Sequence, residues 1–185
     1  TCALPIYFIR RTWILETESG SKIELVLDKG EISASNQVET ICEVEMELVS
    51  GSRSDLFVLA QKLIAHSEVR LGLYSKAARG YRIADNKPLI ADSTLNSVSL
   101  APDSTLEQAF SACLQYGIEF VQKHEQCYFD APALHTLKRI NDGVSVIIHA
   151  FGLFSNILNK DKTKPLLVEL NWLLKELSWV ETAVQ

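Results

Sequence analysis

The sequence lacks any apolar run long enough to span a membrane, and it has no excess of positive charge. Its most hydrophobic segment, Val144–Leu158, is interrupted by serine, histidine, glycine and asparagine. The formal net charge is −5 at pH 7, which excludes a general electrostatic affinity for nucleic acid. We therefore expect neither a membrane nor a nucleic acid among the partners.

Several common catalytic and metal-binding patterns are also missing. There is no P-loop and no GxSxG motif, and the four cysteines show neither zinc spacing nor the arrangement of a disulfide framework. The composition is that of an ordinary globular protein, with 47% hydrophobic and 22% charged residues. The cysteine pattern favours a reducing compartment, so we expect a cytoplasmic location.

Three segments in the first half have the alternation of apolar and charged residues that is typical of β-strands: Tyr7–Thr17, Lys22–Leu27 and Thr40–Leu48. The sequence Asp28-Lys29-Gly30 is a turn signal that should end the second strand. Residues Glu31–Gln37 are expected to form a short strand and a loop. The simplest arrangement is an antiparallel meander with one apolar and one charged face.

The charged face of this sheet is predicted to carry both signs. It would hold Arg10 from the first strand, Glu24 and Asp28 from the second, and Glu43, Glu45 and Glu47 from the third. A row of three carboxylates can be a solvated surface, which the third strand alone favours, or it can line a barrel and hold a divalent metal. Cations and carboxylates together on one concave face suit a polyanion bridged by metal.

Two further features complete the first half. Ser52 or Ser54 can cap an amphipathic helix that ends at His66. The segment Ser75–Arg82 is short, basic and poor in bulky residues. Taken alone, Lys76 and Arg79 indicate a basic surface patch.

The second half changes to a helical period. Residues 85–103 are rich in asparagine, proline, aspartate and serine and have the composition of a linker. Three helices are then predicted: Thr105 to about Cys127, opened by a Ser104–Glu107 capping box, Pro132 to about Leu158, and Lys164–Ala183. Short loops between them suggest an antiparallel bundle, and the predicted fold class is α+β.

Four motifs occur in order along the first half of the chain. They are Phe8-x-Arg10-x-x-Trp13, Ile23-Glu24-x-x-Leu27-Asp28-x-Gly30-Glu31, Ile41-Cys42-Glu43-Val44-Glu45-x-Glu47-Leu48-x-Ser50-Gly51, and Ser75-Lys76-Ala77-Ala78-Arg79-Gly80-Tyr81. Together they resemble the second half of a CYTH domain, of the triphosphate tunnel metalloenzyme superfamily. The bacterial inorganic triphosphatase type, in which a helical CHAD domain follows the CYTH domain, is the most similar. The resemblance implies the C-terminal part of an antiparallel β tunnel over residues 7–84 and the first helices of a CHAD-like domain over residues 104–185.

The resemblance also implies a chemistry, namely hydrolysis of inorganic triphosphate to pyrophosphate and phosphate with Mg²⁺ or Mn²⁺ as cofactor. The implied metal ligands are Glu43, Glu45, Asp28 and Glu24. The implied substrate-binding residues are Arg10, Lys76 and Arg79, and Lys76 is also the implied catalytic residue that positions the attacking water. In a regular strand, however, Arg79 would point away from Lys76.

The family pattern is not complete in this chain. The opening strand of the family, Glu-x-Glu-x-Lys, is absent, and residues 1–6 match the translation of a common sequencing adapter. We therefore expect residues 1–6 to be an artefact and the chain to be a fragment. On this interpretation the parent protein is active and the fragment itself is not.

Two classes of function remain open. The first is the enzyme, either as an inorganic triphosphatase or as a thiamine triphosphatase or adenylate cyclase of the same superfamily. The second is a module that binds phosphate or polyphosphate without turnover. His135-x-x-Lys138-Arg139 resembles the basic motif of a polyphosphate-binding CHAD helix, but the residues that follow it, Ile140-Asn141-Asp142, are not basic. The alternative is that His135 lies on the surface of a helix that only packs.

Overall fold

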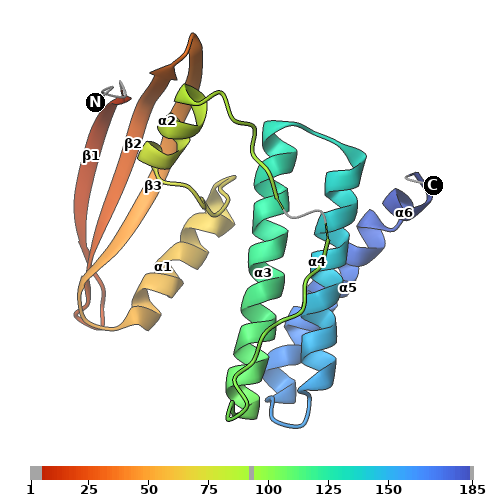
Figure 1. The fold of residues 1–185 in the computed structure, drawn as a ribbon. Coiled ribbons are helices and arrows are strands. Elements are labelled where there is room, and N and C mark those ends of the chain that lie inside the picture. Colours follow the sequence, from red (N-terminus) through yellow and green to blue (C-terminus); the bar gives the residue numbers. More distant parts are fainter. Residues whose placement is uncertain (1–5, 92–93, 184–185) are drawn as a thin grey trace. The chain divides into compact units, whose positions relative to one another are not determined.

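The computed structural model describes residues 6–91 and 94–183 (Figure 1). The chain divides into two compact units, one ending at Pro88 and the other beginning at Leu89. Most of the predicted artefact, residues 1–5, lies outside the described residues. Ile6 belongs to the first strand and is partly buried.

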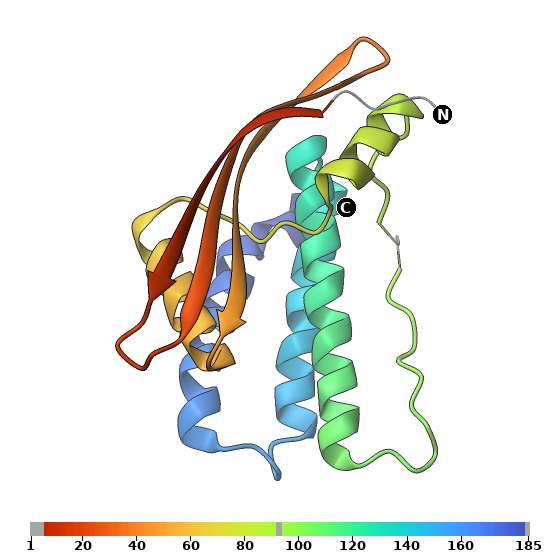
Figure 2. The same cartoon turned by 90° about the vertical axis from the view of Figure 1, so that its left-hand side faces the viewer.

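A three-stranded antiparallel sheet forms the base of the first unit. Its strands are β1 (Ile6–Glu16), β2 (Lys22–Ala34) and β3 (Gln37–Ser50), in the order β1-β2-β3. Figure 2 shows the strands side by side along their length. The predicted antiparallel meander is therefore confirmed.

The second strand is longer than the sequence indicated. Asp28-Lys29-Gly30, which we predicted to be a turn, lies inside β2 and pairs with both neighbouring strands. The prediction was wrong because local turn preference is overridden by pairing on both sides. The real turn is Ser35-Asn36, where φ is +49° and +63°. Two consecutive positive φ angles are what a two-residue hairpin turn of type I′ requires.

One end of the sheet is covered by α2 (Lys76–Ala84), which begins after the N-cap Ser75. Ile83 of this helix packs against Ile32 and Ile41, and all three side chains are at most 3% exposed. Because residues two apart in a strand share a face, this core lies on the same face as Asp28 and Glu43. The packing therefore places the start of α2 beside the charged part of the sheet.

The helix α1 (Arg53–His66) is tied to the turn between β1 and β2. Its N-cap is Ser52, one of the two predicted candidates. The Asp55 carboxylate accepts hydrogen bonds from the hydroxyls of Ser19, at 2.6 Å, and Ser21, at 2.5 Å. These bonds lower the pKa of Asp55. The hydroxyl of Ser21 also accepts from the backbone N–H of Ser52 at 2.9 Å, so the turn and the helix start form one rigid corner.

The second unit is helical. It contains α3 (Leu106–Asp130), α4 (Leu134–Leu153), α5 (Lys160–Leu177) and α6 (Trp179–Ala183). Helix α4 contacts α3, α5 and α6. The helices α3 and α4 approach closely at Gly117 and Gly143, where an added Cβ would lie 2.7 and 2.8 Å from Ile147 and Val121.

Helix boundaries in this unit differ from the predicted ones. The capping box is formed by Thr105 and Gln108, one residue later than predicted. The predicted last helix begins earlier, after an Asn159 cap, and is divided into two near Ser178. Within the described residues, none of the helices combines the length and the apolar character needed to cross a membrane.

Candidate metal and phosphate site

Three carboxylates meet on the face of the sheet that α2 partly covers. Oxygen atoms of Asp28, Glu43 and Glu45 lie within 4.8 Å of one another, and we call these residues the carboxylate triad. Asp28 in β2 is paired in register with Glu43 in β3, and Glu45 follows two residues later on the same face. Asp28 is fully buried, whereas Glu45 is exposed.

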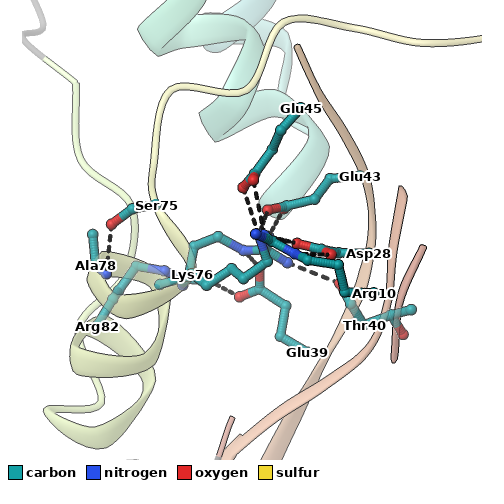
Figure 3. A network of polar contacts seen from close by, with 11 residues as sticks. Arg10, Asp28, Glu39, Thr40, Glu43, Glu45, Ser75, Lys76, Ala78 and Arg82 are labelled. Carbon is teal, nitrogen blue, oxygen red and sulfur yellow. Dashed lines mark hydrogen bonds and ion pairs between the residues drawn. The ribbon is translucent and has the colours of Figure 1, made fainter. Parts of the chain in front are cut away.

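The ammonium group of Lys76 lies among these carboxylates (Figure 3). Its Nζ atom is 2.7 Å from Asp28 Oδ2 and 2.7 Å from Glu45 Oε1, and it also forms an ion pair with Glu43. Burial disfavours the charged form of Lys76, but the hydrogen bonds to the three carboxylates outweigh it and raise the pKa of the lysine. Lys76 therefore remains an ammonium ion at neutral pH.

Arg10, in β1, also binds the triad. Its Nε and Nη2 atoms donate to the two oxygens of Asp28 at 2.8 and 2.6 Å, and Nη2 also donates to Glu45 at 2.9 Å. The bidentate contact with Asp28 raises the pKa of Arg10. Hydrogen bonding from Arg10, joined by Lys76, outweighs burial and lowers the pKa of Asp28 to about 2. A planar guanidinium held in this way presents a fixed orientation.

We expect the stability contributed by Asp28 to be lost in acid. The pKa of this carboxyl falls from 3.8 to about 2 on folding, so its contribution is complete above pH 3.8 and declines as the pH drops through about 2. The difference in thermal denaturation midpoint between wild type and Asp28→Asn should therefore shrink between about pH 5 and pH 2. A difference that stays constant over this range would contradict the assignment, and Glu24→Gln serves as the control outside the triad.

Arg79 lies on the same side as Lys76, contrary to its expected orientation in a strand. The segment is the helix α2, in which residues three apart share a face. The Arg79 Nη1 atom is 2.8 Å from Glu43, Nε is 2.5 Å from Glu39, and Nη2 donates to the carbonyl oxygen of Thr40 at 2.8 Å. Arg79 thus connects the triad to a second acidic group.

Glu39 is an acidic residue of this network that was not predicted from the sequence. It binds Arg79 and also Arg82, at 2.7 Å. The signal was available, because Glu39 continues the alternation of Glu43 and Glu45 in β3, but the strand was predicted to begin at Thr40. Its two ion pairs anchor α2 to the sheet.

Phe8 lies beside the cations of the site, whereas Glu24 lies outside the carboxylate triad. The Phe8 ring lies 5.5 Å from the Arg10 guanidinium and 5.2 Å from the Lys76 ammonium, within the range of cation–π attraction. Glu24 is paired in register with Glu47 and is outside the carboxylate triad. A metal-binding role for Glu24 therefore remains a prediction that this geometry does not favour.

The triad has the chemistry of a site for Mg²⁺ or Mn²⁺. All of its donors are carboxylate oxygens, which these hard cations prefer. Asp28 is fully buried, and the triad already holds one cation, the Lys76 ammonium, at its centre. The residues present therefore fit the metal ion that the resemblance implied.

Known proteins resemble parts of this chain. Residues 1–81 match the family model of the CYTH domain. The chain is also 32% identical over 125 residues to an inorganic triphosphatase of Haemophilus influenzae, a match that covers 66% of this chain and 34% of that protein. The chain thus spans about a third of the length of this relative. Because the matched stretch is longer than the family region, the similarity continues beyond residue 81.

Proposed function

We propose, from the premise that residues 1–81 match the CYTH family model, that the intact protein hydrolyses inorganic triphosphate to pyrophosphate and phosphate. The observation that carries this proposal is the carboxylate triad with Lys76, Arg10 and Arg79 around it. Carboxylates for a divalent metal and cations for phosphate oxygens are the two requirements for binding a linear triphosphate. The cytoplasmic location also remains a prediction.

The carboxylate triad would hold the divalent metal. Bound there, Mg²⁺ or Mn²⁺ would neutralise charge on the phosphate oxygens and make the phosphorus accessible to a nucleophile. Asp28 is suited to this role because its low pKa keeps it ionised over the whole physiological range. Glu45 is the exposed member of the triad, so it lies where an incoming ligand arrives.

Arg10 would bind phosphate oxygens. Its side chain is 44% exposed even while its guanidinium contacts Asp28 and Glu45. Only part of its donor set is therefore used within the protein, and the remaining N–H groups can donate to an anion. Asp28 and the Phe8 ring fix the orientation of the guanidinium before the ligand binds. Arg79 would add positive charge from α2. Its ion pairs with Glu39 and Glu43 hold its side chain more firmly than that of Arg10.

Lys76 is the proposed catalytic residue. Its ammonium group lies between Glu43 and Glu45. A water molecule that accepts a hydrogen bond from this ammonium, beside the bound phosphate, would be oriented for attack on the phosphorus. The raised pKa of Lys76 suits it to donating a hydrogen bond and stabilising charge, rather than to acting as a base.

Polyphosphate binding by the helical unit is not favoured by the structure. Lys138 pairs with Glu181 at 2.5 Å, and Arg139 pairs with Asp142 at 2.9 Å. The basic residues of the predicted motif therefore have acidic partners, which reduces their attraction for a polyanion. Whether this unit is the start of a CHAD domain remains a prediction.

The proposal is tested by measuring phosphate release from tripolyphosphate, with and without Mg²⁺ or Mn²⁺, by the intact protein. We expect metal-dependent release that exceeds the rate with thiamine triphosphate or ATP by about tenfold or more. Binding of tripolyphosphate without release would support the non-catalytic module. Faster turnover of thiamine triphosphate, or formation of cyclic AMP from ATP, would move the assignment to another activity of the superfamily.

A further inference from the structure

The ammonium group of Lys76 and a divalent metal require the same oxygen atoms. Lys76 Nζ contacts each of the three carboxylates whose oxygens lie within 4.8 Å of one another. A metal ion bound by all three would place two cations against one set of ligands. Since like charges at contact distance repel strongly, the two states exclude each other.

We infer that Lys76 is a resident cation that must leave the carboxylate triad before metal can bind, so that metal and triphosphate bind cooperatively. This inference rests on the proposed function and concerns the order in which the ligands of that site are taken up. It assigns Lys76 a role in the unliganded protein in addition to its proposed role in hydrolysis.

Charge balance supports the inference. Among the residues that the structure describes, each carboxylate of the triad and Glu39 has a cationic partner: ion pairs join Lys76, Arg10, Arg79 and Arg82 to Asp28, Glu39, Glu43 and Glu45. A divalent metal added alone would bring two positive charges to carboxylates that these cations already neutralise. A metal added together with triphosphate brings its own counter-charge, and the anion offers new partners to the displaced ammonium.

The structure also allows Lys76 to move while α2 stays in place. The helix is anchored by Ile83 in the core with Ile32 and Ile41, and by the ion pairs of Glu39 with Arg79 and Arg82. None of these contacts involves Lys76. A lysine side chain has four rotatable carbon–carbon bonds beyond Cα, so its ammonium can leave the triad by a change of rotamer.

The coupling must be reciprocal. If triphosphate removes Lys76 from the triad, it raises the affinity for metal, and metal then raises the affinity for triphosphate by the same factor. The expected behaviour is weak binding of either ligand alone and tight binding of both. Free metal at cellular concentration would therefore leave the unliganded site in the Lys76-bound state.

The test is the affinity of the intact protein for Mn²⁺ alone, measured by isothermal titration calorimetry. Lys76→Met should bind Mn²⁺ about tenfold or more tightly than wild type, because the competing charge is gone. The matched control is Lys29→Met, which removes an exposed lysine next to Asp28 on the opposite face of β2. This control should stay within about twofold of wild type. Equal affinities in wild type and Lys76→Met would overturn the inference while leaving the metal site standing.

Further measurements separate the effect of the Lys76 charge from misfolding of a variant and test the coupling between metal and triphosphate. Lys76→Arg keeps the charge and should bind Mn²⁺ about as weakly as wild type, and circular dichroism shows whether each variant is folded.

A methylene-bridged analogue of tripolyphosphate should increase the Mn²⁺ affinity of wild type by a larger factor than that of Lys76→Met. Equal factors would overturn the inference. Absence of Mn²⁺ binding in every variant, with and without the analogue, would overturn both the inference and the proposed metal-dependent function.

Discussion

Replacing Glu43 and Glu45 together by glutamine is expected to lower metal-dependent phosphate release from tripolyphosphate by roughly a hundredfold or more. Glutamine keeps the size and shape of each side chain but removes two of the three negative charges of the carboxylate triad. The remaining carboxylate, Asp28, is already held by Arg10. The measurement is the initial rate of phosphate release as a function of Mg²⁺ concentration.

The matched control for this variant is Glu47→Gln. Glu47 lies in the same strand and, by alternation, on the same face, but outside the triad. The control should keep most of its activity. A double variant as active as wild type would refute the metal role of the triad, and equal losses in the variant and the control would show that only the overall charge of the face matters. Circular dichroism is needed beside the assay, because the double variant also removes partners of Lys76 and Arg10.

Replacing Gly30 by alanine is expected to destabilise the sheet unit by about 2–4 kcal/mol. A Cβ at this position would lie 2.0 Å from the carbonyl oxygen of Tyr7 and 2.5 Å from the Cα of Phe8. These are backbone atoms of the paired strand, so they cannot move aside as a flexible side chain can. The expected result is a lower midpoint of urea denaturation with an unchanged slope.

Gly72→Ala is the control for this substitution. Apart from its chain neighbours, no described heavy atom lies within 4 Å of a Cβ added at Gly72, so its effect should stay within about 0.5 kcal/mol. Equal midpoints for Gly30→Ala and wild type would show that β1 and β2 separate locally without cost. In that case the local separation should still displace Phe8 and Arg10, which follow Tyr7 in β1. A change in the affinity for Mn²⁺ would reveal this displacement.

The sheet was largely predictable because the same alternation of apolar and charged residues occurs in several segments of the sequence. Alternation along three segments indicated three strands, their order and a charged face, and the structure has all of these. The length of β2 was missed because Asp28 and Gly30 are turn-forming residues locally. Their place in the strand depends on partners in β1, which are distant in the sequence: Arg10 for Asp28, and the close backbone of Tyr7 for Gly30.

The helix α2 could not be predicted with the same certainty. The position of this helix on the sheet depends on the packing of Ile83 against Ile32 and Ile41, which are more than forty positions away in the sequence. A local signal was present in Ser75, whose hydroxyl accepts from the N–H of Ala78 as an N-cap. Reading this residue as a cap would have placed Arg79 beside Lys76 from the start.

Most of the proposed site was brought together as the resemblance implied. Asp28, Glu43, Glu45, Arg10 and Lys76 form one network. The periodicity of a strand gives the face of each residue but not its distance along the strand from its partners, so it could not separate Glu24 from the triad. Glu39 was omitted because the third strand was predicted to begin at Thr40. The ion pairs of Lys138 and Arg139 likewise depend on the fold of the helices.

The short turn at Ser35-Asn36 has a consequence for how this site can be gained or lost. The turn fixes which residue of β3 is paired with Asp28, and β3 supplies Glu39, Glu43 and Glu45 at once. A shift of β3 by a single residue would rotate all three carboxylates to the opposite face, while a three-stranded sheet could still form. One inserted or deleted residue in a loop that touches no ligand would thus erase both the metal-binding and the helix-anchoring groups in one evolutionary step.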